Sequence, residues 1–203
     1  MNSQSPSPEA LGEPSARSRH ACAFFESYDE EYRTLLPFAN ECVRCNSRCF
    51  HLHNPEQASE RANLLLQAGA TSDGVAGAQE MRPWEETTVH GGAFNMNDML
   101  ALFRELVTSG SVWANMEWAL RESTGADDFI EFEARINPVI SAHNVFVICT
   151  YQAGRHQPAV MLDVLRAHPM IVVEGKVEPN PLYVPTETFL AELRQRRTAA
   201  QGG

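Results

Sequence analysis

The chain of 203 residues has no long apolar run. No segment approaches the roughly 20 apolar residues needed to cross a bilayer, and residues 1–18 lack the charged-then-apolar layout of a signal peptide. Positive charge is also scarce, because 16 Lys and Arg stand against 26 Asp and Glu, for a formal net charge of −10. We therefore expect a soluble, cytoplasmic protein that binds neither membranes nor nucleic acid directly.

Sequence signals of catalysis are missing as well. No Ser-His-Asp order or paired-carboxylate arrangement can be defended from spacing, and the first apolar run is not followed by the glycine-rich loop that cradles phosphates. Acidic residues follow it instead, in the order Glu26-Ser27-Tyr28-Asp29-Glu30-Glu31. Carboxylates there repel a triphosphate, so we expect no nucleotide cofactor and no enzyme activity.

Hydrophobic residues make up 43% of the chain, which is ordinary for a globular protein. We expect a disordered leader over 1–17, one domain over 18–198 and a flexible tail over 199–203.

Short apolar runs alternate with amphipathic segments, a pattern that predicts a three-layer α/β fold with a mostly parallel sheet and helices on both faces. The predicted strands are 20–25, 48–53, 79–89, 111–120, 144–151, 170–174 and 177–184. The predicted helices are 30–42, 55–67, 126–142, 158–167 and 186–197. One more helix is predicted to begin at a cap, Asn95 or Asn97, and to end at Gly110. The run 144–151 is apolar on both faces and predicts the middle of the sheet.

Soft metal ligands are densest between residues 42 and 53. Cys42, Cys45, Cys49, His51 and His53 are a candidate zinc or haem site, because thiolates and imidazoles are the preferred ligands of such metals. The alternative is that Cys49 is a buried small apolar residue and that the histidines lie near a strand end that faces a pocket. All five cysteines of the chain are expected to be reduced thiols, since their number is odd and no export signal precedes them.

Candidate ligand-binding residues come from several predicted strands and helices. In a parallel sheet the ligand crevice lies at the carboxyl ends of the strands. Two tryptophans on the predicted strand 111–120 can line an apolar cavity there, although core packing explains them slightly better. The candidate set is His20, Cys22, Tyr28, His51, His53, Trp113, Trp118, Glu133, Cys149 and Tyr151.

An ordered set of short segments resembles a known family. The segments are His20-Ala-Cys22-Ala-Phe-Phe, Leu36-Pro-Phe38, Arg48-Cys49-Phe50, Gly92-Ala-Phe94, Trp118-Ala-Leu120, Phe132-Glu133, Cys149-Thr-Tyr151, His168-Pro169 and Asn180-Pro-Leu-Tyr183-Val-Pro185. Together they resemble the MEDS domain, the sensory domain of methanogens, methylotrophs and the dichloromethane-dehalogenase regulator. The resemblance implies a RecA/KaiC-like fold without a working phosphate loop, used to sense small molecules such as hydrocarbon derivatives upstream of transcription or kinase signalling.

Three hypotheses follow from these observations. The first is a sensory domain that binds a small, largely apolar molecule and acts through a separate signalling protein, with a homodimer as one arrangement. The second is a metal, haem or thiol-redox sensor built on the cysteine and histidine residues between 42 and 53. The third is a degenerate nucleotide-binding domain or an interaction scaffold.

Overall fold

The computed structural model describes residues 19–44, 47–53, 59–60, 63–64, 79–83, 94–122 and 126–202. The strands are β1 (His20–Phe25), β2 (Arg48–His53), β3 (Gln79–Pro83), β4 (Gly110–Asn115), β5 (Val147–Gln152), β6 (Met170–Val173) and β7 (Lys176–Pro179). The helices are α1 (Tyr28–Arg44), α5 (Met96–Ser109), α6 (Glu117–Glu122), α7 (Ala126–Arg135), α8 (Asn137–Ser141), α9 (Pro158–Ala167) and α10 (Thr186–Gln201). Within these ranges no helix combines the length and the apolar character needed to span a membrane.

The strands form one seven-stranded sheet in the order β3-β2-β4-β5-β1-β6-β7. All neighbouring pairs are parallel except β6 and β7, which are antiparallel. β5 is the fourth strand of seven, so the prediction that the apolar run 144–151 lies in the middle of the sheet is confirmed. Its strand begins three residues later than predicted and ends at Gln152.

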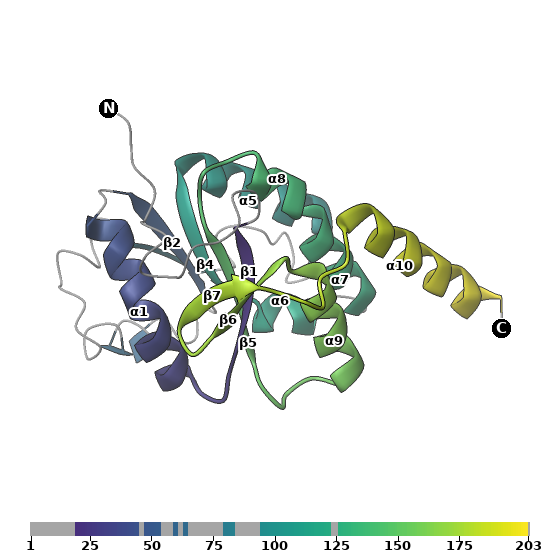
Figure 1. Cartoon of the computed structure of the whole chain (residues 1–203), viewed down its shortest axis with the longest axis horizontal. Coiled ribbons are helices and arrows are strands. Elements are labelled where there is room, and N and C mark those ends of the chain that lie inside the picture. Colours follow the sequence, from purple (N-terminus) through teal and green to yellow (C-terminus); the bar gives the residue numbers. More distant parts are fainter. Residues whose placement is uncertain are drawn as a thin grey trace.

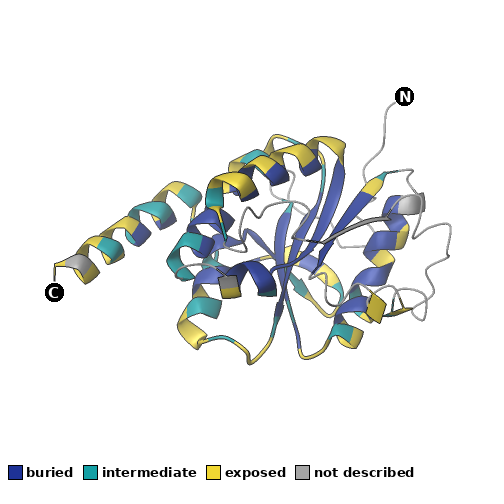
Figure 2. Ribbon diagram, turned by 180° about the vertical axis from the view of Figure 1, so that it is seen from behind, coloured by how far each residue is buried: buried dark blue, intermediate teal, exposed yellow. Residues whose placement is uncertain are grey.

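Helices cover both faces of the sheet, which confirms the predicted three layers (Figure 1). α1 packs on one face, which we call the α1 face, and its core contains Tyr32, Phe38 and Trp113. The other face, which we call the α7 face, is covered by residues of α5 to α10, including Phe103, Phe129 and Phe189. The central strands are buried along their length, as Figure 2 shows, because both of their faces are covered.

Local sequence explains several element boundaries. The Asn95 side chain accepts hydrogen bonds from the backbone N–H groups of Asn97 and Asp98, so Asn95 is the N-cap of α5. Pro158 is the first residue of α9, where its missing N–H costs nothing. A Cβ at Gly110 would lie 2.3 Å from the carbonyl oxygen of Arg48, so glycine permits the close contact of β4 with β2.

The structure corrects four predicted boundaries. Strand β4 ends at Asn115 and α6 begins at Glu117, so Trp118 lies on a helix and not on the predicted strand 111–120. The predicted helix 126–142 is divided into α7 and α8, and Pro138 is near the start of the second. The segment 177–184 is a strand only as far as Pro179. Helix α10 continues to Gln201, where a flexible tail was expected.

Other predictions agree with the structure or fall outside its described part. β1 and β2 have the predicted bounds, and α1 continues through Pro37 for 17 residues, longer than the predicted 30–42. The predicted leader 1–17 and most of the helix 55–67 lie outside the described residues, as does the end of the segment 79–89.

Candidate functional site

A cluster of four ligand-type side chains is buried on the α7 face. It consists of His20, Glu133, Cys149 and His168, and one ligand atom of each lies within 4.8 Å of the others. The four side chains are 0 to 1% exposed. Within the described ranges this is the one group of three or more such residues that is gathered closely enough to hold a metal ion.

The distances inside the cluster are short. The Nε2 atom of His20 lies 3.4 Å from the Oε2 atom of Glu133 and 3.4 Å from the Sγ atom of Cys149. The Nε2 atom of His168 lies 3.3 Å from the same Glu133 oxygen. Despite this proximity, Glu133 Oε2 and His168 Nε2 have no partner with hydrogen-bond geometry among the described residues. A buried polar atom without a partner lowers the free energy of unfolding by about 1–3 kcal/mol, so this arrangement is destabilising as it stands.

Both histidines are oriented by hydrogen bonds at their other ring nitrogen. His168 Nδ1 lies 2.7 Å from the carbonyl oxygen of Val164, which can only accept, so Nδ1 carries the proton. Asn137 donates through its Nδ2 atom to the Ala167 carbonyl, which leaves its Oδ1 atom to accept from His20 Nδ1 at 2.9 Å. In the neutral rings both Nε2 atoms therefore present lone pairs to Glu133.

Four separate elements bring the cluster together. His20 is the first residue of β1, and Cys149 is the third residue of its parallel neighbour β5. Glu133 lies on the sheet-facing side of α7, and His168 is the C-cap of α9. The cluster therefore lies between the sheet and its helices, level with the first residue of β1. We expected a crevice at the carboxyl ends of the strands, and the cluster is not there.

Electrostatics keep Glu133 charged and Cys149 neutral. Burial alone would raise the pKa of Glu133, but His168 and His20 in their protonated forms, which carry positive charge and can donate through Nε2, outweigh burial and hold that pKa at about 2. Burial, followed by the charge of Glu133, raises the pKa of the Cys149 thiol well above its ordinary value. Burial and the neighbouring His168 lower the pKa of His20, against the opposing effect of Glu133.

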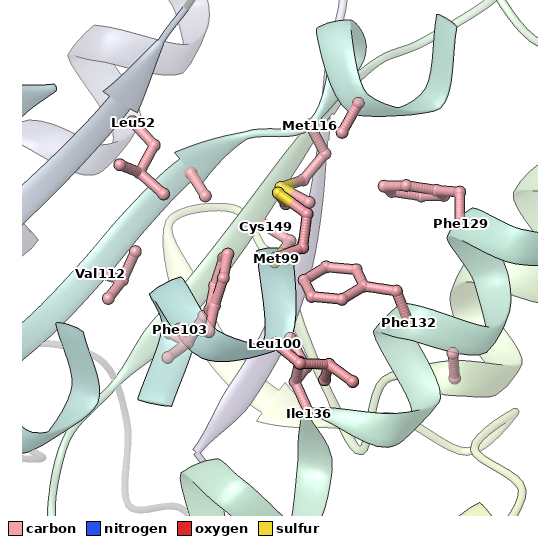
Figure 3. Packing of buried hydrophobic residues seen from close by; sticks show 14 of the residues in the cluster. Leu52, Met99, Leu100, Phe103, Val112, Met116, Phe129, Phe132, Ile136 and Cys149 are labelled. Carbon is pink, nitrogen blue, oxygen red and sulfur yellow. The ribbon is translucent and has the colours of Figure 1, made fainter. Parts of the chain in front are cut away.

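An apolar layer adjoins the cluster on the same face. Tyr151 donates its hydroxyl to Glu133 Oε1 at 2.7 Å, and its ring packs edge-on against Phe129. The core around Cys149 contains two methionines, Met99 and Met116, together with the rings of Phe103, Phe129 and Phe132. Figure 3 shows these side chains pointing between the helices and the sheet. Thioether side chains adapt their shape more readily than branched ones, so this layer can rearrange around a guest.

A second buried carboxylate lies on the α1 face, with a different environment. Glu31 of α1 accepts hydrogen bonds from Trp113 Nε1 at 2.8 Å, Thr150 Oγ1 at 2.7 Å and Asn115 Nδ2 at 3.3 Å. Each donor comes from the sheet. We call these four residues the Glu31 network, and it joins the first turn of α1 to β4 and β5.

The structure separates the predicted ligand-binding residues into two groups. His20, Cys22, Trp118, Glu133, Cys149 and Tyr151 lie on the α7 face. Tyr28, His51, His53 and Trp113 belong to the α1 face or adjoin it. The two tryptophans therefore do not form one wall. Sequence reasoning missed His168, although the His168-Pro169 segment carried part of the family resemblance.

The predicted metal site between residues 42 and 53 is not assembled in the described part of the chain. Cys42 and Cys49 lie together in the α1-face core. The ring nitrogens of His51 are occupied, because Tyr32 OH lies 2.5 Å from Nε2 and the Trp113 carbonyl lies 3.1 Å from Nδ1. Cys45 lies outside the described residues, and no group of three ligands from this segment is gathered among those described.

The turn between β1 and α1 is closed by its own carboxylates. Ser27 Oγ accepts a hydrogen bond from the Glu30 N–H at 3.2 Å, and the Glu30 carboxylate accepts from the Glu26 N–H at 2.8 Å. This reciprocal arrangement resembles a capping box. The acidic residues that replace a glycine-rich loop thus begin the helix and satisfy backbone donors, some of which a phosphate would otherwise use.

Known structures place this sheet order in a recognised class. The chain is similar to the flagellar accessory protein FlaH from Methanocaldococcus jannaschii, with a TM-score of 0.56, 10% identity and coverage of 87% of each chain. It is also similar to a second solved structure, an ATPase domain, with a TM-score of 0.50 and 9% identity, over 84% of this chain and 75% of that one. Identities this low show the fold alone, and the fold is RecA-like, as expected.

The sequence itself identifies the family. Residues 19–169 match the model of the MEDS domain, the methanogen/methylotroph, DcmR sensory domain. The match covers well over half of the chain, which therefore belongs to this family of sensory domains. All four cluster residues lie inside it, with His20 and His168 each next to one of its ends. No curated protein matches the chain.

Proposed function

We propose that this sensory domain binds a small, largely apolar molecule on the α7 face and passes the signal to a separate protein of transcription or kinase signalling. The observation that carries the proposal is the family match over 19–169, which encloses the cluster and the apolar layer beside it. The proposed binding region is the layer formed by Met99, Met116 and Phe129, next to Cys149 and Tyr151.

We infer that the domain works by binding and not by catalysis. The closed turn between β1 and α1 supports this inference. The Glu30 carboxylate accepts a hydrogen bond from the Glu26 N–H, and the Glu31 carboxylate accepts from three donors of the sheet. A triphosphate at this turn would meet two carboxylates where phosphate-binding loops offer free N–H groups.

The proposed output surface is α10, which projects from the body of the domain in Figure 1. The helix lies outside the family match and is attached to α7, which carries Phe129 and Glu133, and to α9, whose C-cap is His168. Arg196 contacts Asp163 of α9 at 2.7 Å, and Arg197 contacts Asp128 of α7 at 2.9 Å. A movement of α7 on ligand binding would therefore reach α10. The partner is a separate signalling protein or a second copy of this chain.

Methyl resonances of the methionines test the binding site. We would titrate protein labelled at the methionine methyls with toluene, dichloromethane and 1-butanol as probes. We expect saturable shifts at Met99 and Met116, because a guest in the apolar layer displaces their side chains. Met170 is the internal control, since it is equally buried but belongs to the α1-face core.

The opposite pattern would contradict the proposal. Equal shifts at Met170 would indicate nonspecific partitioning, and unchanged Met99 and Met116 resonances up to the solubility limit of all three probes would place the ligand elsewhere. ATP serves as a second control and is expected to leave these methyls unchanged.

A further inference from the structure

We propose that His20, Glu133, Cys149 and His168 form a closed four-ligand zinc site. The proposal goes beyond ligand sensing and does not depend on it. It rests on the converging lone pairs, the spacing of the ligand atoms and the charge of the four groups.

The lone pairs give the first argument. His20 and His168 carry their protons on Nδ1, so both Nε2 atoms present lone pairs to the interior of the cluster. Glu133 Oε2 presents a third acceptor, and no described group donates to it with hydrogen-bond geometry. His20 Nε2 accepts from the Cys149 thiol at 3.4 Å, but His168 Nε2 and Glu133 Oε2 are acceptors that face each other, and such a pair repels in a water-free interior unless a cation lies between them.

The spacing gives the second argument. In tetrahedral zinc sites, bonds of about 2.0–2.3 Å place neighbouring ligand atoms about 3.3–3.7 Å apart. Three of the six edges of the cluster fall in or next to this range, at 3.3 Å for His168 to Glu133, 3.4 Å for His20 to Glu133 and 3.4 Å for His20 to Cys149, and the other three are at most 4.8 Å. A haem does not fit a cluster whose four ligand atoms all lie within 4.8 Å of one another.

The charge gives the third argument. When zinc binds, the Cys149 thiol loses its proton to solvent and a Zn–S bond forms, so that one proton is released for each ion bound. The thiolate and the Glu133 carboxylate together carry two negative charges, and the histidines remain neutral. A divalent cation therefore leaves the buried site with no net charge, which a monovalent or trivalent ion would not achieve.

The surroundings of the four ligands have the features of a metal site. Each histidine has a hydrogen-bonded acceptor at Nδ1, Asn137 Oδ1 in one case and the Val164 carbonyl in the other. Tyr151 orients the remaining oxygen of Glu133. Such outer contacts fix the ligands in place. Four protein ligands complete the coordination of zinc, so the site has a structural or regulatory role and no open position for a substrate.

Metal analysis tests the proposal with a closely matched control. Cys22 and Cys149 are aligned in neighbouring strands, are both fully buried and face the same side of the sheet, but the Cys22 thiol donates to the Met170 carbonyl. The untagged protein would be stripped with a chelator, reloaded with Zn²⁺ and desalted. We expect one zinc per chain in the wild type and in Cys22→Ser, and less than about a tenth of an equivalent in Cys149→Ser and His168→Gln.

Cobalt substitution identifies the thiolate. We expect tetrahedral ligand-field bands and a thiolate-to-cobalt charge-transfer band in the wild type, and the charge-transfer band should vanish in Cys149→Ser. If that variant does not fold, serine variants of the other four cysteines, one at a time, show whether any of them supplies the thiolate instead. The band should persist in each of four variants, at Cys22, Cys42, Cys45 and Cys49.

Two results would overturn the zinc site. One is a folded, stripped wild-type protein that takes up less than about a tenth of an equivalent of zinc. The other is loss of the band in Cys45→Ser or another of the four variants, which would place the metal in the segment 42–53. Neither result affects the methionine titration, so the failure of the zinc site and the failure of ligand sensing are distinguishable.

Discussion

Glu31 on one face of the sheet and Glu133 on the other are the most deeply buried glutamates among the described residues, and their carboxylates differ in what surrounds them. Glu31 on the α1 face receives three hydrogen bonds from neutral donors. Glu133 on the α7 face receives one, from Tyr151, and its second oxygen faces two imidazole nitrogens without a hydrogen bond. A buried carboxylate therefore does not by itself mark a site. The number of donors around it distinguishes a structural contact from a place that binds a cation.

Substituting each glutamate by glutamine should give the largest contrast. In metal-free protein we expect Glu31→Gln to lower the free energy of unfolding by about 2–4 kcal/mol, because the new NH₂ group faces donors. Glu133→Gln should cost less than about 1 kcal/mol or stabilise the fold, since its NH₂ group can donate to His168 Nε2. Urea unfolding of both variants measures the difference, and equal losses would contradict this view of the two faces.

Trp113→Phe should have a smaller effect on the α1 face. The variant removes the indole N–H that donates a hydrogen bond to Glu31 and keeps most of the buried ring. We expect a loss of about 1–3 kcal/mol in the free energy of unfolding. A double-mutant cycle with Glu31→Gln isolates this hydrogen bond. The loss in the double variant should be smaller than the sum of the two single losses by roughly 1 kcal/mol. Strict additivity would mean that the bond contributes nothing to stability.

The pH dependence of the metal-free protein should show the smallest effect. The pKa of His20 is lowered in the folded state from an ordinary value of 6.5, so the unfolded chain takes up a proton first as the pH falls. Stability should therefore decline from pH 7 to 5, and His20→Asn should flatten that decline.

Urea unfolding at pH intervals from 8 to 5 gives the slope of stability against pH for the wild type and for His20→Asn. An unchanged slope between pH 7 and 5 in His20→Asn would show that His20 does not titrate differently on folding.

Much of the fold was predictable because local sequence carries its signals. The apolar runs that became β1 and β2, the Asn95 cap and the helix start at Pro158 all depend on residues close in sequence. The predicted strand 111–120 was wrong in its second half. Helix α6 has only six residues, too few to show a helical period. The apolar residues Ala114, Met116 and Trp118 alternate with Asn115 and Glu117 across its start, as they would in a strand.

The candidate site was predictable only in part. His20, Glu133 and Cys149 were named from the sequence, but the pattern within a strand does not tell which layer of helices each face meets. His51 and Trp113 were consequently grouped with residues from which the sheet separates them. His168 was missed because a histidine before a proline at the end of a helix is also explained by helix termination.

Strand β5 donates a hydrogen bond to both Glu31 and Glu133. Tyr151 and Cys149 point to the α7 face, while Thr150 between them donates to Glu31 on the other. The Cα atom of Thr150 is about 3.8 Å from that of each neighbour along one backbone. A guest or ion that shifts β5 by a few tenths of an ångström would therefore also alter the hydrogen bond that fastens the first turn of α1. The two sides of the domain are mechanically linked through a single peptide unit, without any side chain passing through the sheet.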